Sequence, residues 1–497
     1  MRFSPKLSLT PCILCVVSST ALFASLLAAA ASNNPIPQVV GPPVPQAVIP
    51  GSGAFTLAVY GANFVQGAVV NWNRSPRSTT FISAHELQAQ ILASDVANPT
   101  AGYITVTNPP PGGGVSSSSY GLVEVHEPAS TIVAKRTQVL FAGNGSAVLD
   151  LADFNNDGIL DFAAEAGDAT IKVFLGNGDG TFRFGSIATN NYYGSGPAAI
   201  ASGDFNNDGN EDLAFGADWT GPPTQVGVNL GEGNGKFRYG SRFGYFPNLF
   251  PFVIAVGDFN RDGNLDLATV PGTGIGTDLA VFLGNGDGTF KRLVNYSVAG
   301  VPMFTADFNG AGILDLVFLR DYAIYVMLGN GDGTFQKPQE VISSTHQIGN
   351  CGFGQVLFVT DFNADGNADL AYCERDYPAN RGKIWIALGN GDGTFKKPVS
   401  ITVHPYQGAF SFAVGDFNSD GKTDLLANYW MAGNPNKTET DLFLGNGDGT
   451  FQPRKIINLG REPYNAEEGI VTADFNSGGL LDFIFQQPGE VDVFVQK

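Results

Sequence analysis

The sequence predicts an all-β chain in which a seven-bladed β-propeller follows a small β-sandwich. The main observation is a phrase, DFNxDGxxD, that recurs intact or altered at intervals of 49 to 58 residues. Its seven copies start at Asp153, Asp204, Asp258, Asp307, Asp361, Asp416 and Asp474. Each repeat holds four short apolar runs and no helix-length period, which is typical of a propeller blade. The composition agrees, because 64 Gly, 29 Pro and only 15% charged residues favour short strands and tight turns.

Residues 1–31 are predicted to be a secretory signal peptide. Arg2 and Lys6 precede an almost continuous apolar stretch, and LLAAAAS offers a small-residue cleavage site near Ala31. We therefore expect a secreted or cell-surface, extracytoplasmic protein that does not insert into a membrane after cleavage; a retained membrane anchor is the alternative. Cleavage removes two basic residues and changes the net charge from −19 to −21. This acidity argues against nucleic acid and anionic membranes as partners.

Residues 32–50 are rich in proline and predict a linker or an entry strand. Residues 51–127 alternate apolar and polar positions in short runs separated by turn residues, which predicts a small β-sandwich. The phrases FTLAVYGANFVQGAVVNWN, ELQAQILASD and ITVTNPPPGGGVSSS resemble an IPT/TIG immunoglobulin-like domain. The resemblance implies a spacer or an interaction module.

The repeats occupy residues 134–497, and their strand count predicts how the ring closes. A second phrase, LGNGDGTF, has six copies, intact or altered, each joining the third strand of a repeat to the fourth. The seventh repeat ends without it, so it lacks a fourth strand, while a spare strand, 137–143, precedes the first repeat. We expect this strand to complete the last blade and to remove two open sheet edges. The GNGDG phrases themselves are expected to be hairpin turns that use Gly and Asn at positive φ, and not metal loops.

The first phrase has the donor pattern of a calcium loop. Calcium takes six to eight oxygen ligands in flexible geometry. In the first copy, Asp153, Asn155 and Asp157 supply side-chain oxygens at positions 1, 3 and 5, Ile159 offers a carbonyl at position 7 and Asp161 closes the loop at position 9. Gly at position 6 permits the sharp turn, and Phe at position 2 points into the sheet packing. The other four complete sets are Asp204, Asn206, Asp208, Asn210 and Asp212; Asp258, Asn260, Asp262, Asn264 and Asp266; Asp361, Asn363, Asp365, Asn367 and Asp369; and Asp416, Asn418, Asp420, Lys422 and Asp424.

Two copies have lost a carboxylate, because Ala311 and Gly478 stand at position 5 of the loops that start at Asp307 and Asp474. Whether these degraded loops bind calcium stays open. An EF-hand is a poor alternative, because the acidic closure comes at position 9 and the flanking segments are strands. The pattern resembles the FG-GAP/VCBS repeats of integrin-α-type propellers across all seven repeats. The resemblance implies about five calcium sites and an adhesion or recognition role.

The remaining candidates concern a ligand and catalysis. The connections between strands 2 and 3, and between blades, carry aromatic residues that suit a protein or glycan partner: Tyr192, Tyr193, Trp219, Tyr245, Tyr377, Tyr406, Tyr429 and Trp430. The first hypothesis is a monomeric, non-enzymatic adhesion or recognition module; a lectin-like binder is the second. A polysaccharide lyase using His346 or His404 as a base is the third, without a recognisable catalytic motif behind it. Cys351 and Cys373 flank one loop and are expected to form a disulfide.

Overall fold

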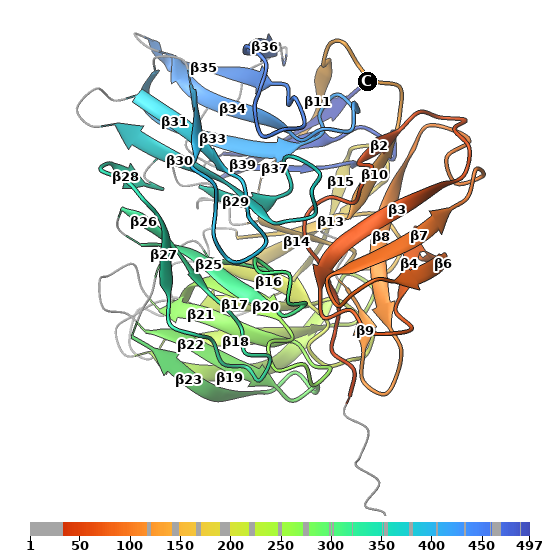
Figure 1. Cartoon of the computed structure of the whole chain (residues 1–497), viewed down its shortest axis with the longest axis vertical. Coiled ribbons are helices and arrows are strands. Elements are labelled where there is room, and N and C mark those ends of the chain that lie inside the picture. Colours follow the sequence, from red (N-terminus) through yellow and green to blue (C-terminus); the bar gives the residue numbers. More distant parts are fainter. Residues whose placement is uncertain are drawn as a thin grey trace, which may run out of the picture. The chain divides into compact units, whose positions relative to one another are not determined.

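The computed structural model describes residues 33–116, 121–141, 149–165, 170–188, 199–217, 224–246, 251–271, 278–297, 300, 303–320, 322–349, 351, 356–376, 381–403, 406–431, 434–457, 459, 469–487 and 489–497. The predicted signal peptide, 1–31, lies outside these residues. In the described ranges the regular elements are strands (Figure 1). No helix in them is long and apolar enough to cross a membrane.

The N-terminal part is a two-sheet sandwich. One sheet has the order β1 (Gln38–Val39), β3 (Phe55–Ala62), β7 (Glu86–Ile91), β6 (Ser78–Phe81). The other has the order β2 (Ala47–Val48), β10 (Leu122–Val125), β8 (Thr100–Asn108), β4 (Val69–Trp72), β5 (Ser75–Pro76), with β9 (Gly114–Val115) paired to β8. Alternate residues of these strands, including Leu57, Val70, Trp72 and Ile104, form one buried core. The alternation seen in the sequence therefore has its physical cause in one buried face per sheet.

Seven further sheets follow; five of them pair four strands in chain order, and a sixth pairs its strands in chain order with one additional strand beside the first. The first three consist of β12 (Leu149–Ala152), β13 (Asp161–Glu165), β14 (Ile171–Gly176), β15 (Phe182–Ile187); β16 (Ile200–Gly203), β17 (Asp212–Ala217), β18 (Thr224–Gly231), β19 (Phe237–Phe246); and β20 (Pro251–Gly257), β21 (Asp266–Pro271), β22 (Leu279–Gly284), β23 (Phe290–Tyr296). The next three consist of β24 (Met303–Ala306), β25 (Asp315–Arg320), β26 (Ala323–Met327), β27 (Gln339–Ser343); β28 (Gln347–Ile348), β29 (Leu357–Thr360), β30 (Asp369–Asp376), β31 (Arg381–Ala387), β32 (Val399–Thr402); and β33 (Tyr406–Gly415), β34 (Asp424–Met431), β35 (Asn434–Phe443), β36 (Lys455–Ile457). We call these six sheets blades 1 to 6.

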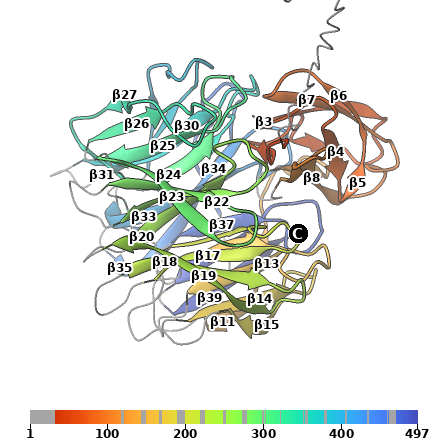
Figure 2. The same cartoon turned by 90° about the horizontal axis from the view of Figure 1, so that it is seen from below.

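The seventh sheet, blade 7, joins the two ends of the repeat region. Its order is β11 (Ala134–Phe141), β39 (Glu490–Gln496), β38 (Asp482–Gln487), β37 (Ile470–Ala473). β11 pairs antiparallel with β39, from Ala134 opposite Gln496 to Phe141 opposite Glu490, and the two strands lie side by side in Figure 2. The strand expected at 137–143 thus starts three residues earlier and supplies the fourth strand of the last blade.

Both repeated phrases are explained by contacts between neighbouring blades. The N–H of Gly235, in the turn of blade 2, donates to the carbonyl of Phe154, at position 2 of the loop of blade 1, at 3.0 Å. The rings of Phe154 and Phe237 meet edge to face with centroids 5.6 Å apart. The same ring pair recurs at Phe205–Phe290, Phe259–Phe335, Phe308–Phe395, Phe362–Phe451 and, across the closure, Phe182–Phe475. In six of the seven repeats the phenylalanine of DF therefore packs on the phenylalanine that ends the second phrase of the next blade, whereas Phe417 of blade 6 meets Phe483 instead.

The predicted disulfide is confirmed. Cys351 is bonded to Cys373 in β30, with Cα atoms 6.2 Å apart, and both residues are buried in the largest core cluster. The bond ties the segment before β29 to the second strand of blade 5.

Candidate metal-loop face

Each complete DFNxDGxxD copy forms a loop that its own side chains hold in shape. In blade 3, Asp258 accepts hydrogen bonds from the N–H groups of Asp262 at 3.1 Å and Gly263 at 2.9 Å. Asn260 accepts from the same Asp262 N–H at 2.9 Å. Arg261 and Gly263 have φ of 60° and 86°, so positions 4 and 6 are both left-handed. These hydrogen bonds from the side chains to the backbone fix the shape of the loop.

The residue at position 9 has a second role that the sequence did not reveal. Asp266 is fully buried, and its Oδ2 accepts from the N–H of Phe259 at 2.9 Å while its Oδ1 accepts from the N–H of Gly284 at 2.9 Å. One carboxylate thus joins strand 2 to the ends of strands 1 and 3. The six equivalents make the same two bonds: Asp161, Asp212, Asp315, Asp369, Asp424 and Asp482. The two degraded loops keep this arrangement, so the position-9 carboxylate holds the strands of the blade together even where the position-5 carboxylate is missing.

These carboxyl groups carry raised pKa values. Burial raises the pKa of Asp266 to about 8, hydrogen bonding to Gly284 opposes the shift, and the charges of Asp258 and Asp262 add to it. The pKa is likewise about 8 for Asp369, Asp424 and Asp482, and about 7 for Asp161, Asp212 and Asp315. Burial is the first cause in every case. A cation in the loop would favour the ionised carboxylates that burial disfavours.

The two roles can be separated by substitution. Asp266→Ala leaves buried N–H groups of Phe259 and Gly284 unpaired, at about 1–3 kcal/mol each. We expect it to lower the free energy of unfolding in chelator as well as in calcium. Asp262→Ala, at the half-buried position 5, should lower stability chiefly in calcium. Urea denaturation of both variants with calcium and with chelator measures the difference, and equal effects of Asp266→Ala and Asp262→Ala in chelator would contradict it.

The donor set fits calcium. Every side chain at positions 1, 3, 5 and 9 of the complete loops is a carboxylate or an amide, and the flexible all-oxygen set suits calcium better than magnesium, which demands stricter geometry. Within the described ranges, no three His, Cys, Asp or Glu side chains are grouped so that they could hold a metal ion as they stand. The reason is visible in blade 1, where Asp153 and Asp157 oxygens accept backbone N–H groups. Binding would require these carboxylates to share their oxygens with the ion.

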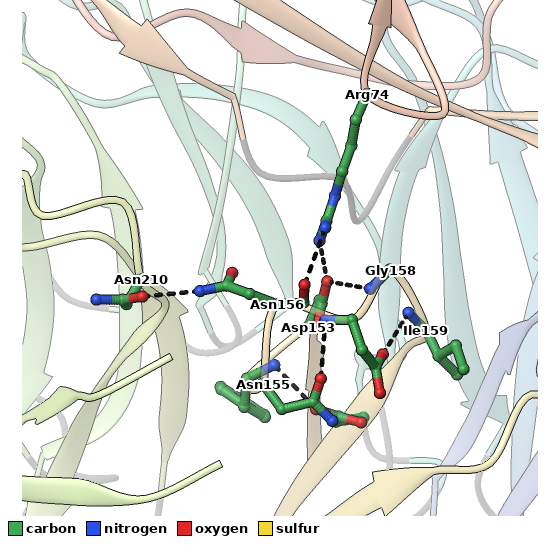
Figure 3. A network of polar contacts seen from close by, with 10 residues as sticks. Arg74, Asp153, Asn155, Asn156, Gly158, Ile159 and Asn210 are labelled. Carbon is green, nitrogen blue, oxygen red and sulfur yellow. Dashed lines mark hydrogen bonds and ion pairs between the residues drawn. The ribbon is translucent and has the colours of Figure 1, made fainter. Parts of the chain in front are cut away.

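Neighbouring loops are also connected to one another. Asn156 at position 4 donates to the side-chain oxygen of Asn210, at position 7 of the next loop, at 2.7 Å (Figure 3). Asn207 donates to Asn264 in the same way at 2.8 Å. At all five position-7 residues (Ile159, Asn210, Asn264, Asn367 and Lys422) the N–H donates to the position-5 carboxylate. The asparagines at position 4 were not among the predicted site residues; their place in a left-handed conformation beside the next loop is the signal that identifies them.

The degraded loops keep the backbone of the complete ones. Asp307 accepts from the N–H of Ala311 at 3.0 Å, and Asp474 accepts from the N–H groups of Gly478 at 3.0 Å and Gly479 at 2.8 Å. Only the position-5 carboxylate is missing. The loss therefore lowers the number of ligands without changing the fold of the loop.

The sandwich lies against this loop face. Arg74, in the β4–β5 hairpin, pairs with Asp153 and also donates to the carbonyl of Asn156 at 3.2 Å (Figure 3). The N–H of Ile36 donates to Asp258 Oδ2 at 2.8 Å. These contacts span blades 1 and 3, and three more reach blades 4, 6 and 7: Asn63 N to Gly312 O at 2.9 Å, Ala129 N to Asn418 O at 2.7 Å, and Tyr103 Oη to Asp474 O at 2.7 Å. None of them follows from a repeated motif, and the sequence did not predict them.

A cavity of about 330 Å³ lies between the sandwich and the inner strands of the propeller. Glu124 and Asp416 line it, and no Lys, Arg or His is among the described residues of its wall. Glu124 is 2% exposed; one of its oxygens accepts from Ser419 Oγ and the other has no hydrogen-bond partner. Burial raises the pKa of Glu124 well above its usual range, and the charge of Asp416 adds to the shift. Burial therefore disfavours the ionised form of this carboxyl group.

The predicted aromatic face needs one correction. Tyr429 is 1% exposed within β34, and its hydroxyl donates to Glu439 at 2.6 Å and to Asp441 at 2.9 Å beside Arg454. This buried polar cluster removes Tyr429 from any exposed surface. Trp430 follows it in the same strand and is half-buried. Tyr245 and Tyr406 belong to β19 and β33 with side chains outside the description, and Tyr192, Tyr193, Trp219 and Tyr377 lie outside the described residues.

The geometry around the two candidate histidines gives little support to the polysaccharide lyase hypothesis. His346 Nδ1 lies 3.5 Å from Glu374, which is 3% exposed and also accepts from Trp385 Nε1 at 2.5 Å. His404 lies outside the described residues. The carboxylate of Glu374 thus holds the ring of His346 in place.

The GNGDG phrases are hairpin turns, as predicted. In blade 3, Asn285 N–H donates to the Thr289 carbonyl at 3.0 Å, and Gly286 and Gly288 have φ of 72° and 78°. Asp287 accepts from the Thr289 hydroxyl at 2.5 Å, which lowers the pKa of this exposed carboxyl. Glycine, and not asparagine, takes the left-handed positions. The aspartate of the turn therefore stabilises the hairpin in which it lies.

Comparison with known proteins agrees with this geometry. The family model described as FG-GAP-like repeat matches residues 153–215, 307–372 and 361–427. The chain therefore contains FG-GAP-like repeats, and its four-stranded sheets are typical of the β-propeller class. It is similar to integrin alpha-8 of Homo sapiens, with 28% identity over 117 residues that make up 21% of this chain and 11% of that relative. The match thus spans a small part of the relative's length.

Two of the solved structures that the chain matches have low identity and low TM-scores. A lectin of Agrocybe aegerita, described as recognising non-reducing terminal N-acetylglucosamine, is 17% identical with a TM-score of 0.45, and the match covers 84% of this chain and 98% of that one. An auxiliary nutrient binding protein from Bacteroides ovatus is 12% identical with a TM-score of 0.39, and the match covers 93% of this chain and 98% of that one.

Proposed function

We propose that this FG-GAP propeller is a secreted or cell-surface, monomeric calcium-binding protein that acts as a non-enzymatic recognition or adhesion module. The observation that carries the proposal is the set of five complete loops, each with three carboxylates that include a buried one at position 9. In the loop of blade 3, for example, Asp258, Asp262 and Asp266 form no ion pair with a basic side chain within the described residues. Such a set favours a divalent cation.

In each complete loop the ion would be held by the side chains at positions 1, 3, 5 and 9 and the carbonyl at position 7. When bound, calcium supplies positive charge that offsets the buried carboxylates. The carboxylates of the loop itself order the surrounding backbone. The position-1 and position-5 carboxylates order the turn, and the position-9 carboxylate transmits that order to three strands of the blade. Calcium thus acts on stability and on the shape of the loop face, not on a chemical reaction.

A calcium count tests the proposal. We expect the protein, freed of metal with chelator and dialysed against calcium, to hold about five ions per chain by elemental analysis. Asp262→Ala and Asp420→Ala should each remove one ion, whereas Asp287→Ala, in a GNGDG turn, should remove none. A count of zero in folded protein would overturn the calcium assignment.

We propose an extracellular protein or a glycan as the partner. The sandwich makes hydrogen bonds to loops of several blades, which leaves the opposite ends of the blades for a ligand. This is the face to which the 2–3 connections, including that after β34, belong. A glycan array and a pull-down from cell surfaces, each with calcium and with chelator, separate the two ligand classes. Loss of glycan binding in Trp430→Ala, with Tyr429→Phe unchanged, would identify the lectin-like form of the function.

A further inference from the structure

The sandwich inserts a histidine into one of the two degraded loops. His85 lies just before β7, and its side chain is 17% exposed. Its Nδ1 lies 2.9 Å from Oδ2 of Asp307, whose side chain is fully buried, and 2.8 Å from the carbonyl of Gly61. Its Nε2 lies 2.9 Å from the carbonyl of Gly366, in the loop of blade 5. One ring therefore connects the sandwich to the loops of blades 4 and 5.

All three partners of this ring are hydrogen-bond acceptors. A carboxylate and a carbonyl face Nδ1, and a carbonyl faces Nε2. A neutral imidazole has one donor and one acceptor nitrogen, whereas the imidazolium has two donors. In the neutral form one nitrogen lone pair would face a carbonyl or carboxylate oxygen. The geometry thus favours the cation, independently of any titration.

The position of this cation is specific. Blade 4 is the loop in which Ala311 replaces the position-5 aspartate, and its Asp307 Oδ2 also accepts from the N–H of Gly312 at 2.6 Å. The complete loop of blade 1 also meets a cation, but Arg74 there is 58% exposed and can leave. His85 is enclosed, because Ala84 and Asn63 pack against Gly312.

We propose that His85 is the resident cation of the fourth loop, an imidazolium from the sandwich that offsets the buried charge of Asp307, as calcium would offset it in the complete loops, and locks the sandwich to blades 4 and 5. The contacts of His85 do not depend on calcium. The comparison of His85 with calcium in the complete loops rests on the proposed function. The degraded loop is then a docking site for the chain's own N-terminal domain. The fourth loop would thus exchange the metal for a histidine side chain.

The surroundings of the ring are acidic. Besides Asp307, the ring of Tyr60 lies 5.8 Å away, and Glu86, Asp361 and Asp365 act on Tyr60 from β7 and the loop of blade 5. Burial lowers the pKa of His85, but the hydrogen bond and charge of Asp307 and the two carbonyls outweigh it, so the pKa is raised above 6.5. The stability from a raised histidine pKa is fully present below the unfolded value and is lost as pH rises through the folded value.

The first experiment counts calcium. Ala311→Asp restores the missing carboxylate while His85 stays in place, and we expect no additional ion per chain. Ala311→Asp combined with His85→Ala should bind one additional ion. Gly478→Asp restores the seventh loop, where no histidine contact is present among the described residues, and should add one ion without a second change. An additional ion in Ala311→Asp alone would overturn the exchange.

The second experiment tests the lock without metal. In chelator, His85→Gln should melt below wild type at pH 6, and the difference should shrink by pH 9, because the wild type loses its imidazolium. His126→Gln, in the same domain, should follow wild type at both pH values. A His85→Gln difference that is the same at pH 6 and pH 9, or absent, would overturn the cation assignment. If wild type binds no calcium but this result holds, the proposed calcium function fails and the lock remains.

Discussion

Removal of calcium is expected to lower the melting temperature of the protein, and to lower it more at pH 8 than at pH 5. An ion that binds only the folded state stabilises that state by mass action, by about 2.7 kcal/mol per site when free calcium is a hundred times its dissociation constant. Five complete loops would add several such contributions. Calorimetry with calcium and with chelator, at both pH values, measures the effect.

The pH dependence follows from the position-9 carboxyls. Their pKa values are about 7 or about 8 in the calcium-free fold, as for Asp161 and Asp266, against an ordinary value of 3.8. Between these limits the folded chain binds more protons than the unfolded one, so the stability of the calcium-free protein falls as pH rises. At pH 5 protons neutralise these groups in place of calcium. At pH 8 a larger share of these groups is ionised and needs a cation to offset its charge, so the difference between calcium and chelator is larger there than at pH 5.

Two controls make the result specific. Magnesium at the same concentration should restore less of the melting temperature than calcium, because it demands stricter geometry and dehydrates reluctantly. Mutation of position 5 in all five complete loops should bring the calcium curve down to the chelator curve. Melting temperatures that coincide with and without chelator at pH 8 would contradict the prediction.

The repeat could be predicted because each blade is a local unit. The spacing of the DFNxDGxxD copies predicts the sheets, and the missing fourth strand of the last repeat predicts the place of β11. The double use of position 9 could have been suspected from the two degraded loops. They have lost the position-5 carboxylate yet keep Asp315 and Asp482, as a residue needed for folding would be kept.

The contacts of the sandwich could not be predicted in this way. Arg74, His85 and Glu124 each occur once, and each meets a partner at least 79 residues away in the chain. A single cation or acid in a β-sandwich gives no periodic signal. The prediction for Tyr429 is wrong for a different reason. The sequence places this aromatic residue near the end of a strand and suggests an exposed ring, but Glu439, Asp441 and Arg454 surround its hydroxyl and bury it.

Disruption of β11 is expected to destabilise the whole propeller, and not just one blade. β11 supplies the outer strand of blade 7 and, from the same residues, contacts blade 1. Gln138 accepts from the N–H of Phe182 at 2.7 Å and donates to its carbonyl at 2.8 Å, and Thr137 donates to the carbonyl of Gly180 at 2.7 Å. These bonds join the two ends of the repeat region. Loss of β11 would expose the edge of β39 along seven paired residues.

We therefore expect the double variant Val139→Pro and Leu140→Pro to lose the single cooperative melting transition of the wild-type propeller. Successive strand residues direct their N–H groups to opposite sides, so one of the two prolines must remove a bond to β39. The unpaired edge should also promote association through strand pairing, visible as larger species in size-exclusion chromatography. The matched control is Lys455→Pro with Ile456→Pro in β36, which is an outer strand of blade 6 and takes no part in the closure. If both double variants melt at the same temperature and stay monomeric, each outer strand stabilises only its own blade. The prediction that ring closure depends on β11 would then be wrong.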